Sequence, residues 1–191
     1  MTTSYSFMYI NMILSLLLFV ASILIPTFLV LTSPPTSRWH DIPELLMKYA
    51  LFFNVGCLFF TGFMGQMMHA PDIAALLGWG WSPFQYELAF SELGLAILGL
   101  MSPLFEAQFW LATIICATVW LLGGSGVHLY YLWSVGNRDI INASFVIGWN
   151  IFIALWLIGL FIFVIYSRLR KESLVDIAEL ELEIETRQQD Y

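Results

Sequence analysis

Long apolar runs alternate with short polar connectors along the whole chain. The runs cover about residues 7–31, 43–68, 83–100, 107–131 and 145–166. A helix rises about 1.5 Å per residue, so about 20 apolar residues cross a hydrocarbon layer about 30 Å thick. The pattern therefore predicts an all-α membrane protein, built as a bundle of five transmembrane helices.

A shorter apolar segment lies between the second and third runs. It covers about residues 72–77, which is too short to span a membrane, and the sequence GWGW follows it. The side chains of Trp79 and Trp81 are of the type that gathers at membrane interfaces. We therefore expect a short interfacial or re-entrant helix between the second and third transmembrane helices.

The end of the chain differs in composition from the rest. Residues 1–167 form the predicted transmembrane domain, and residues 168–191 form an acidic tail that holds seven of the 14 Asp and Glu residues. The tail mixes helix-forming residues with a broad apolar set, which fits either a surface or self-associating helix or a frayed end. Its negative charge disfavours binding to anionic lipid.

Composition supports a membrane protein and gives no sign of a soluble enzyme. The chain is 60% hydrophobic and 11% charged, whereas about 25% of a typical soluble domain is charged. Cys57 and Cys116 lie inside predicted spans, where we interpret them as small apolar residues rather than a disulfide or redox pair. Motifs for nucleotide binding, serine hydrolysis and zinc proteolysis are missing, and there is no basic patch for nucleic acid. The sequence therefore favours neither an enzyme nor a nucleic-acid partner.

The positive charges predict an orientation. Cytoplasmic loops of membrane proteins carry an excess of Lys and Arg. With the C-terminus in the cytoplasm, six of the seven positive charges fall on that side: Arg38, Lys48, Arg168, Arg170, Lys171 and Arg187. Only Arg138 falls outside, and five spans then place the N-terminus outside as well.

In this orientation the unusual polar residues gather in the outer half of the bundle. His69 ends the second span, His128 approaches the outer end of the fourth, and the third begins with several polar residues. The predicted ligand-binding residues are Trp79, Gln85, Glu87, Glu92, His128, Asn137 and Asn142. They outline an outward-facing polar pocket with the Trp79 segment as its lid.

The third span carries two carboxylates on different faces. At 100° per residue, Gln85 and Glu92 share a face, while Glu87 lies about 140° away from Glu92. Glu92 is also about 7.5 Å deeper than Glu87. A lone carboxylate at that depth is costly and calls for a partner. Glycines before His128 allow a neighbouring helix to approach closely, so we expect His128 to contact one of these carboxylates.

Three interpretations of these polar residues stay open. They could form hydrogen bonds that only fix helix packing, or bind and conduct a small ligand, ion or proton. They could also belong to a membrane oxidoreductase or accessory subunit that binds haem or a metal ion through His69 and His128. Five spans are few for a monomeric transporter, so conduction implies a homo-oligomer or a partner membrane subunit within the lipid bilayer.

The stretch GWGWSPFQYELAFSELG resembles an uncharacterised family of small bacterial integral membrane proteins. Its members carry a pattern close to G-W-x-x-S-P-F-Q-x-E-x-G-F-x-N-L-x-x-G, followed by G-H near the end of the next span and by an Asn-rich loop. The resemblance covers about residues 69–151 and implies a bacterial inner membrane protein of unknown activity. A looser similarity to DoxX-like membrane proteins exists at the level of fold.

The resemblance bears on individual residues. It carries over Gly78, Trp79, Ser82, Pro83, Phe84, Gln85, Glu87, His128, Asn137 and Asn142. The chain departs from the pattern at Ala89, where the family has glycine, and at Glu92, where it has asparagine. The family pattern therefore supports Glu87 as a site residue but leaves Glu92 as a feature of this chain.

Overall fold

The computed structural model describes residues 2–32, 42–134, 136 and 145–189, and these residues form helices joined by short turns, with no strand among them. The helices are α1 (Thr2–Thr32), α2 (Ile42–Leu51), the π-helix η1 (Phe52–Cys57), α3 (Leu58–Leu76), α4 (Phe84–Met101), the 3₁₀ helix η2 (Ser102–Leu104), α5 (Ala107–Ser134) and α6 (Val146–Gln189). The prediction of an all-α fold is confirmed.

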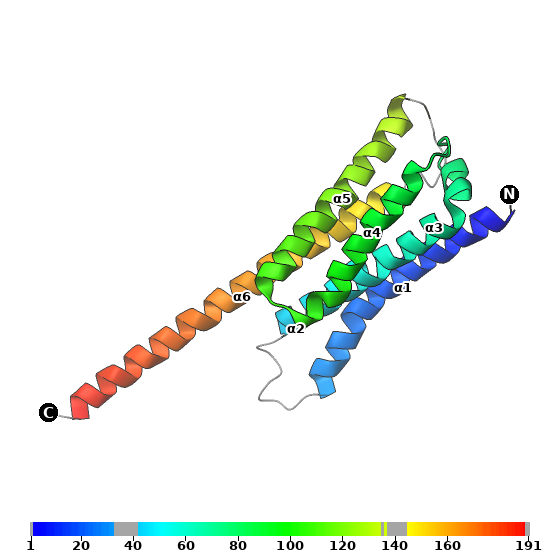
Figure 1. Ribbon diagram of the computed structural model, residues 1–191. Helices are drawn as coiled ribbons and strands as arrows, with labels where there is room; N and C mark the ends of the chain where they lie inside the picture. Colours follow the sequence, from blue (N-terminus) through cyan, green and yellow to red (C-terminus); the bar gives the residue numbers. More distant parts are fainter. Residues whose placement is uncertain (1, 33–41, 135, 137–144, 190–191) are drawn as a thin grey trace.

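Five helical segments of the described chain are long and apolar enough to cross a membrane. They begin at Tyr9, Ile42, Phe84, Ala107 and Val146. Figure 1 shows them side by side in one bundle, with α6 continuing past it towards the C-terminus. Large apolar side chains cover the outside of the bundle, as lipid-facing helices require. The five-helix membrane bundle predicted from the apolar runs is therefore confirmed.

The short helix predicted over residues 72–77 is part of α3. His69 has non-helical backbone angles (φ −135°, ψ 24°) and marks a kink inside α3, two residues before Pro71. Proline lacks an N–H and its ring clashes with the preceding turn, so a helix bends at this point. After the kink α3 continues to Leu76, and Gly78 turns the chain with a positive φ of 69°.

Glycines let the second and third spans touch through their backbones. A Cβ atom at Gly99 of α4 would lie 2.1 Å from the backbone nitrogen of Gly56, which belongs to η1. Such a distance leaves no room for a side chain on either residue. Further along the same antiparallel interface, Gly62 of α3 lies against Glu92 of α4. The close approach of the backbones therefore sets which side chains meet between α3 and α4.

At the end of the bundle where α6 projects beyond it, the charged side chains of Lys48 and Arg168 lie beside the buried ring of Trp110. Arg168 Nε donates to Glu44 Oε1 at 2.8 Å, which ties α6 to the start of α2. The Arg168 guanidinium carbon and the Lys48 Nζ atom lie 5.7 and 6.0 Å from the centroid of the Trp110 ring. The Trp110 indole N–H donates to the carbonyl oxygen of Ser102 at 2.8 Å. These contacts bring α2, η2, α5 and α6 together.

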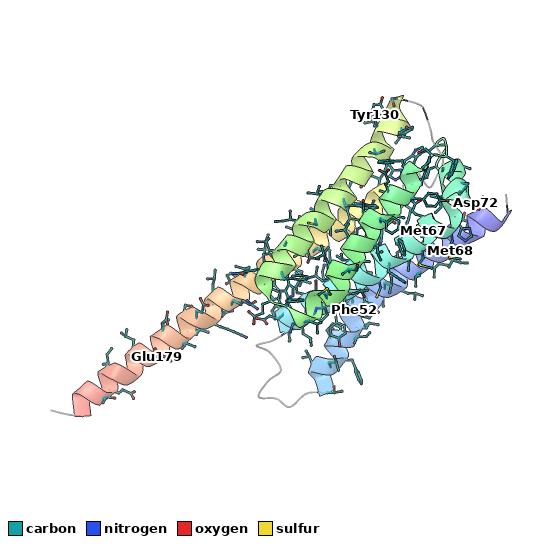
Figure 2. The ribbon with its side chains drawn as sticks, viewed as in Figure 1. Phe52, Met67, Met68, Asp72, Tyr130 and Glu179 are labelled. Carbon is teal, nitrogen blue, oxygen red and sulfur yellow. The ribbon has the colours of Figure 1, made fainter. Side chains whose placement is uncertain are left out.

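The acidic tail is the last part of one long helix. α6 runs without interruption from Val146 to Gln189, and its described side chains after Lys171 are all exposed. Figure 2 shows Glu179 on this projecting part, far from Tyr130 and Asp72 at the opposite end of the bundle. The sequence left open whether the tail is a helix or a frayed end, and in the structure it is a helix.

Candidate functional site

Five of the seven predicted ligand-binding residues belong to the described chain, and Asn137 and Asn142 lie outside it. Gln85 lies at the start of α4, and Glu87 and Glu92 lie further along the same helix. Trp79 and His128 form a pair at the end of α5.

Gln85 caps the first turn of α4. Its Oε1 atom accepts hydrogen bonds from the Ser82 backbone N–H at 2.8 Å and from the Ser82 hydroxyl at 3.3 Å. A Ser followed three residues later by Gln is the sequence of a capping box, in which the later side chain satisfies a backbone donor at the helix start. The segment SPFQ carried this signal, so the Gln85 oxygen has a structural role that the sequence could have revealed.

Glu87 and Glu92 have opposite surroundings. Glu87 is exposed on the bundle surface, whereas the Glu92 residue is 5% exposed. The difference agrees with the angle of about 140° between the two positions on a helical wheel. A ligand-binding role for Glu87 stays a prediction.

Trp79 and His128 come together from distant parts of the chain. Their rings stack with centroids 5.3 Å apart and an angle of 25° between the planes, and Tyr131 lies 5.5 Å from Trp79. His128 is 8% exposed. The turn after α3 therefore covers the end of α5 through this aromatic contact.

His69 lies at the kink of α3, on the surface of the bundle. Its Nδ1 atom is 3.7 Å from Asp72 Oδ2, and both side chains are substantially exposed. Within the described residues, no cluster of three or more His, Cys, Asp or Glu side chains is arranged to hold a metal ion. A haem or metal site on His69 and His128 stays a prediction.

Glu92 is the buried acid of the α3–α4 interface. Its carboxyl group lies against Gly62, where a Cβ atom would be only 2.8 Å from Glu92 Oε2. That oxygen is buried and has no hydrogen-bond partner within the part of the chain that the structure describes. The ion pairs found in the described part of the chain are His69–Asp72 and Arg168–Glu44, so neither involves Glu92. Glu92 thus occupies the apolar interface as a carboxyl group that has no counter-ion among the described residues.

Two residues of the second span that carry buried polar atoms were not predicted as functional. The Gln66 Oε1 atom is buried without a partner, one helical turn after Gly62 on α3. Asn54 of η1 is 1% exposed, and its Nδ2 donates to Ser22 Oγ of α1 at 3.1 Å. The sequence shows both as polar residues within an apolar run. It does not show that their polar atoms are buried, because burial depends on how the helices pack and hydrophobic periodicity alone does not predict that packing.

A shallow surface depression, too small to enclose a water molecule, lies at the α2–α6 end of the bundle. It is lined by Pro43, Glu44, Val164, Ser167, Arg168 and Lys171. Its lining includes the Glu44–Arg168 ion pair and none of the predicted ligand-binding residues. The predicted outward-facing pocket stays a prediction.

Comparison with known proteins places the chain in a family. A model described as "Family of unknown function (DUF6790)" matches residues 12–171, which cover most of the first apolar span and the following ones up to the start of the tail. No curated protein and no solved structure matches the chain. The match confirms the prediction of an uncharacterised family, whereas the motif itself and the DoxX likeness stay predictions. The chain belongs to this family of unknown function, DUF6790.

Proposed function

We propose that this membrane protein conducts a proton or a small monovalent cation and binds it at Glu92, between α3 and α4. The proposal rests on the burial of one side chain. Glu92 is 5% exposed, and its Oε2 atom has no hydrogen-bond partner among the described residues. The residue lies eight positions after Phe84 in a span that ends at Leu104, or about 12 Å along the helix. This depth is close to the middle of the span.

The cost of burying a charge explains why an ion belongs there. Placing a charged side chain at the centre of a transmembrane helix costs about 2.5 to 3.5 kcal/mol on insertion scales. A bound proton or cation removes that cost by neutralising the carboxylate. Glu92 has no counter-ion from the protein among the described ion pairs. An exchangeable ion therefore fits the site better than a permanent charge.

The surroundings of Glu92 suit a small ion. Gly62 contributes no side chain, so the carboxyl group lies directly against the α3 backbone. Gln66, one turn further along α3, carries a second buried oxygen without a partner. Carboxylate and amide oxygens are the hard ligands that small cations prefer. Gln66 follows Gly62 by four residues, so helical periodicity places both on one face of α3, which supports the choice of a proton or cation over an anion.

We further propose that the ion enters from the outer face, at the end of the bundle formed by Trp79 and His128. In this proposal the C-terminus is cytoplasmic, the N-terminus is outside, and the bilayer is the bacterial inner membrane. The gathering of Lys48 and Arg168 around Trp110 at the opposite end supports the orientation, because cytoplasmic ends are rich in Lys and Arg. A homo-oligomer or partner membrane subunit completes the pathway.

The test is ion uptake into liposomes that contain the purified full-length protein. We expect movement of protons or of one alkali cation with the wild type, and loss of that movement with Glu92→Gln. Glu106→Gln serves as the matched control, because Glu106 is an exposed acid in the link between η2 and α5. Absence of movement in every oligomeric state, or equal movement through Glu92→Gln, would refute the proposal.

A further inference from the structure

The projecting part of α6 carries an unpaired apolar stripe. Ile177, Leu180 and Ile184 are 54%, 59% and 50% exposed, and no other helix covers them. A helix in water draws most of its stability from packing an apolar face against something else. We therefore expect another apolar surface to pack against this stripe.

The spacing of the stripe is that of a coiled coil. Ile177, Leu180 and Ile184 follow one another at steps of three and four residues, which are the a and d positions of a heptad. Isoleucine at a and leucine at d favour a two-stranded pair. In the same register Asp176 occupies a g position and Glu181 an e position, so both edges of the stripe are acidic.

Pairing between two copies of this tail is disfavoured by charge. Two copies with the same topology in one membrane project their tails in the same direction, so the tails would pair in parallel. In a parallel pair a g residue faces the e residue five positions later on its partner. Asp176 of one copy would then face Glu181 of the other along both edges, and like charges in these positions repel.

The charge of the tail also opposes a membrane occupant and favours a basic one. Between Lys171 and Arg187 the chain has no Lys or Arg and carries Glu172, Asp176, Glu179, Glu181, Glu183 and Glu185. Anionic lipid repels such a segment, and α6 points away from the bundle rather than lying across its end (Figure 1). We infer that the tail of α6 docks a basic amphipathic helix of another protein, with Lys or Arg facing Asp176 and Glu181.

The docking test uses the full-length protein in nanodiscs of zwitterionic lipid. The probe is a fluorescent three-heptad peptide with Ile at a, Leu at d and Lys at e and g. The control peptide carries Glu at e and g. We expect the Lys peptide to bind, the Glu peptide to fail, and the affinity for the Lys peptide to fall at least about tenfold between low and high salt.

Variants of the tail locate the binding surface. Ile177→Ser combined with Leu180→Ser removes the stripe and should abolish binding, whereas Val175→Ser, on the opposite face, should leave binding unchanged. Equal binding of the Lys peptide to the double variant would overturn the inference. So would equal binding of the Lys and Glu peptides.

Charge reversal tests the rival occupant, a second copy. Glu181→Lys would place an attractive Asp176–Lys contact along both edges of a parallel pair. We expect cross-linking between tails to appear with Glu181→Lys and to be absent with the wild type. Wild-type tails that cross-link as strongly as Glu181→Lys would show self-pairing and overturn the inference. Ion uptake is not measured in any of these tests, so they are independent of the function proposed for Glu92.

Discussion

Glu87 and Glu92 are five positions apart on α4, yet the first carboxyl group is exposed and the second is buried against Gly62. Helical geometry is enough to predict that the two acids point in different directions. It does not predict which helix faces Glu92, because the alignment of α3 with α4 depends on close glycine contacts. The sequence therefore identified the acid, and only the structure identifies Gly62 as its neighbour.

For the other candidate residues too, the sequence identified the residue more readily than its contacts. The Trp79–His128 stack joins two predicted residues that lie far apart in the sequence. The described ring contact of His128 is with Trp79, and a contact between His128 and Glu87 or Glu92 stays a prediction. Gln85 turned out to cap α4, a role that the segment SPFQ already indicated.

Gly62→Ala should disturb the Glu92 site. The added methyl group would lie 2.8 Å from Glu92 Oε2, so the carboxyl group must move. Because the carboxyl group is the end of a flexible side chain, we expect a loss of stability at the lower end of the range for overpacking, about 1 kcal/mol. Thermal unfolding in detergent measures it.

A double-mutant cycle is the control for Gly62→Ala. Glu92→Ala removes the clashing carboxyl group, so the cost of Gly62→Ala should shrink in that background. Additive effects of the two substitutions would contradict the contact between these residues.

For the helices, the sequence predicts that each one exists better than it predicts where each one begins and ends. Each apolar run became a helix because lipid requires every backbone N–H and C=O group to be paired within the segment. The π-helix η1 escaped prediction, since it occurs inside one continuous apolar run. The break expected between the second span and the short helix over residues 72–77 is a kink at His69 inside α3 rather than a gap between two helices. The extent of α6 also escaped prediction, because its acidic continuation lacks the apolar signal of a span.

Gly99→Ala should destabilise the bundle more than a glycine substitution on an open face of the same helix. Its Cβ atom would lie 2.1 Å from the backbone nitrogen of Gly56, which a flexible side chain cannot relieve. We expect a cost at or above the upper end of the usual 1 to 3 kcal/mol for overpacking, about 3 kcal/mol or more. Resistance to heat-induced aggregation in detergent reports the change.

Gly94→Ala is the matched control on α4. A Cβ atom at Gly94 meets no other atom within 4 Å. The substitution should leave stability unchanged or raise it slightly, because alanine favours helix more than glycine does. Equal losses for both variants would refute the close packing of α4 against η1.

At the scale of the whole molecule, the structure has two distinct ends. The N-terminus lies at the end that carries Asp72 and Tyr130, and the C-terminus projects beyond the opposite end (Figures 1 and 2). Odd numbers of spans place the two termini on opposite sides of a membrane. The distribution of Lys and Arg predicts that the projecting tail lies in the cytoplasm.

Cysteine labelling in intact cells tests this assignment. The background is Cys57→Ser with Cys116→Ser, because both native cysteines are free. A membrane-impermeant maleimide should label Ser4→Cys from outside and label Ser173→Cys only after the membrane is permeabilised. The reverse pattern would show that the molecule is inserted the other way round.

The function proposed above requires that the Glu92 carboxyl group hold an exchangeable proton or monovalent cation inside the bundle. Infrared difference spectroscopy of the reconstituted protein, recorded on changing pH and on exchanging lithium, sodium and potassium, observes the carboxyl C=O and carboxylate vibrations directly. We expect a band that responds to protons or to one of these cations, disappears in Glu92→Gln and persists in Glu106→Gln. A spectrum that is identical in the wild type and Glu92→Gln would show that Glu92 binds no exchangeable ion.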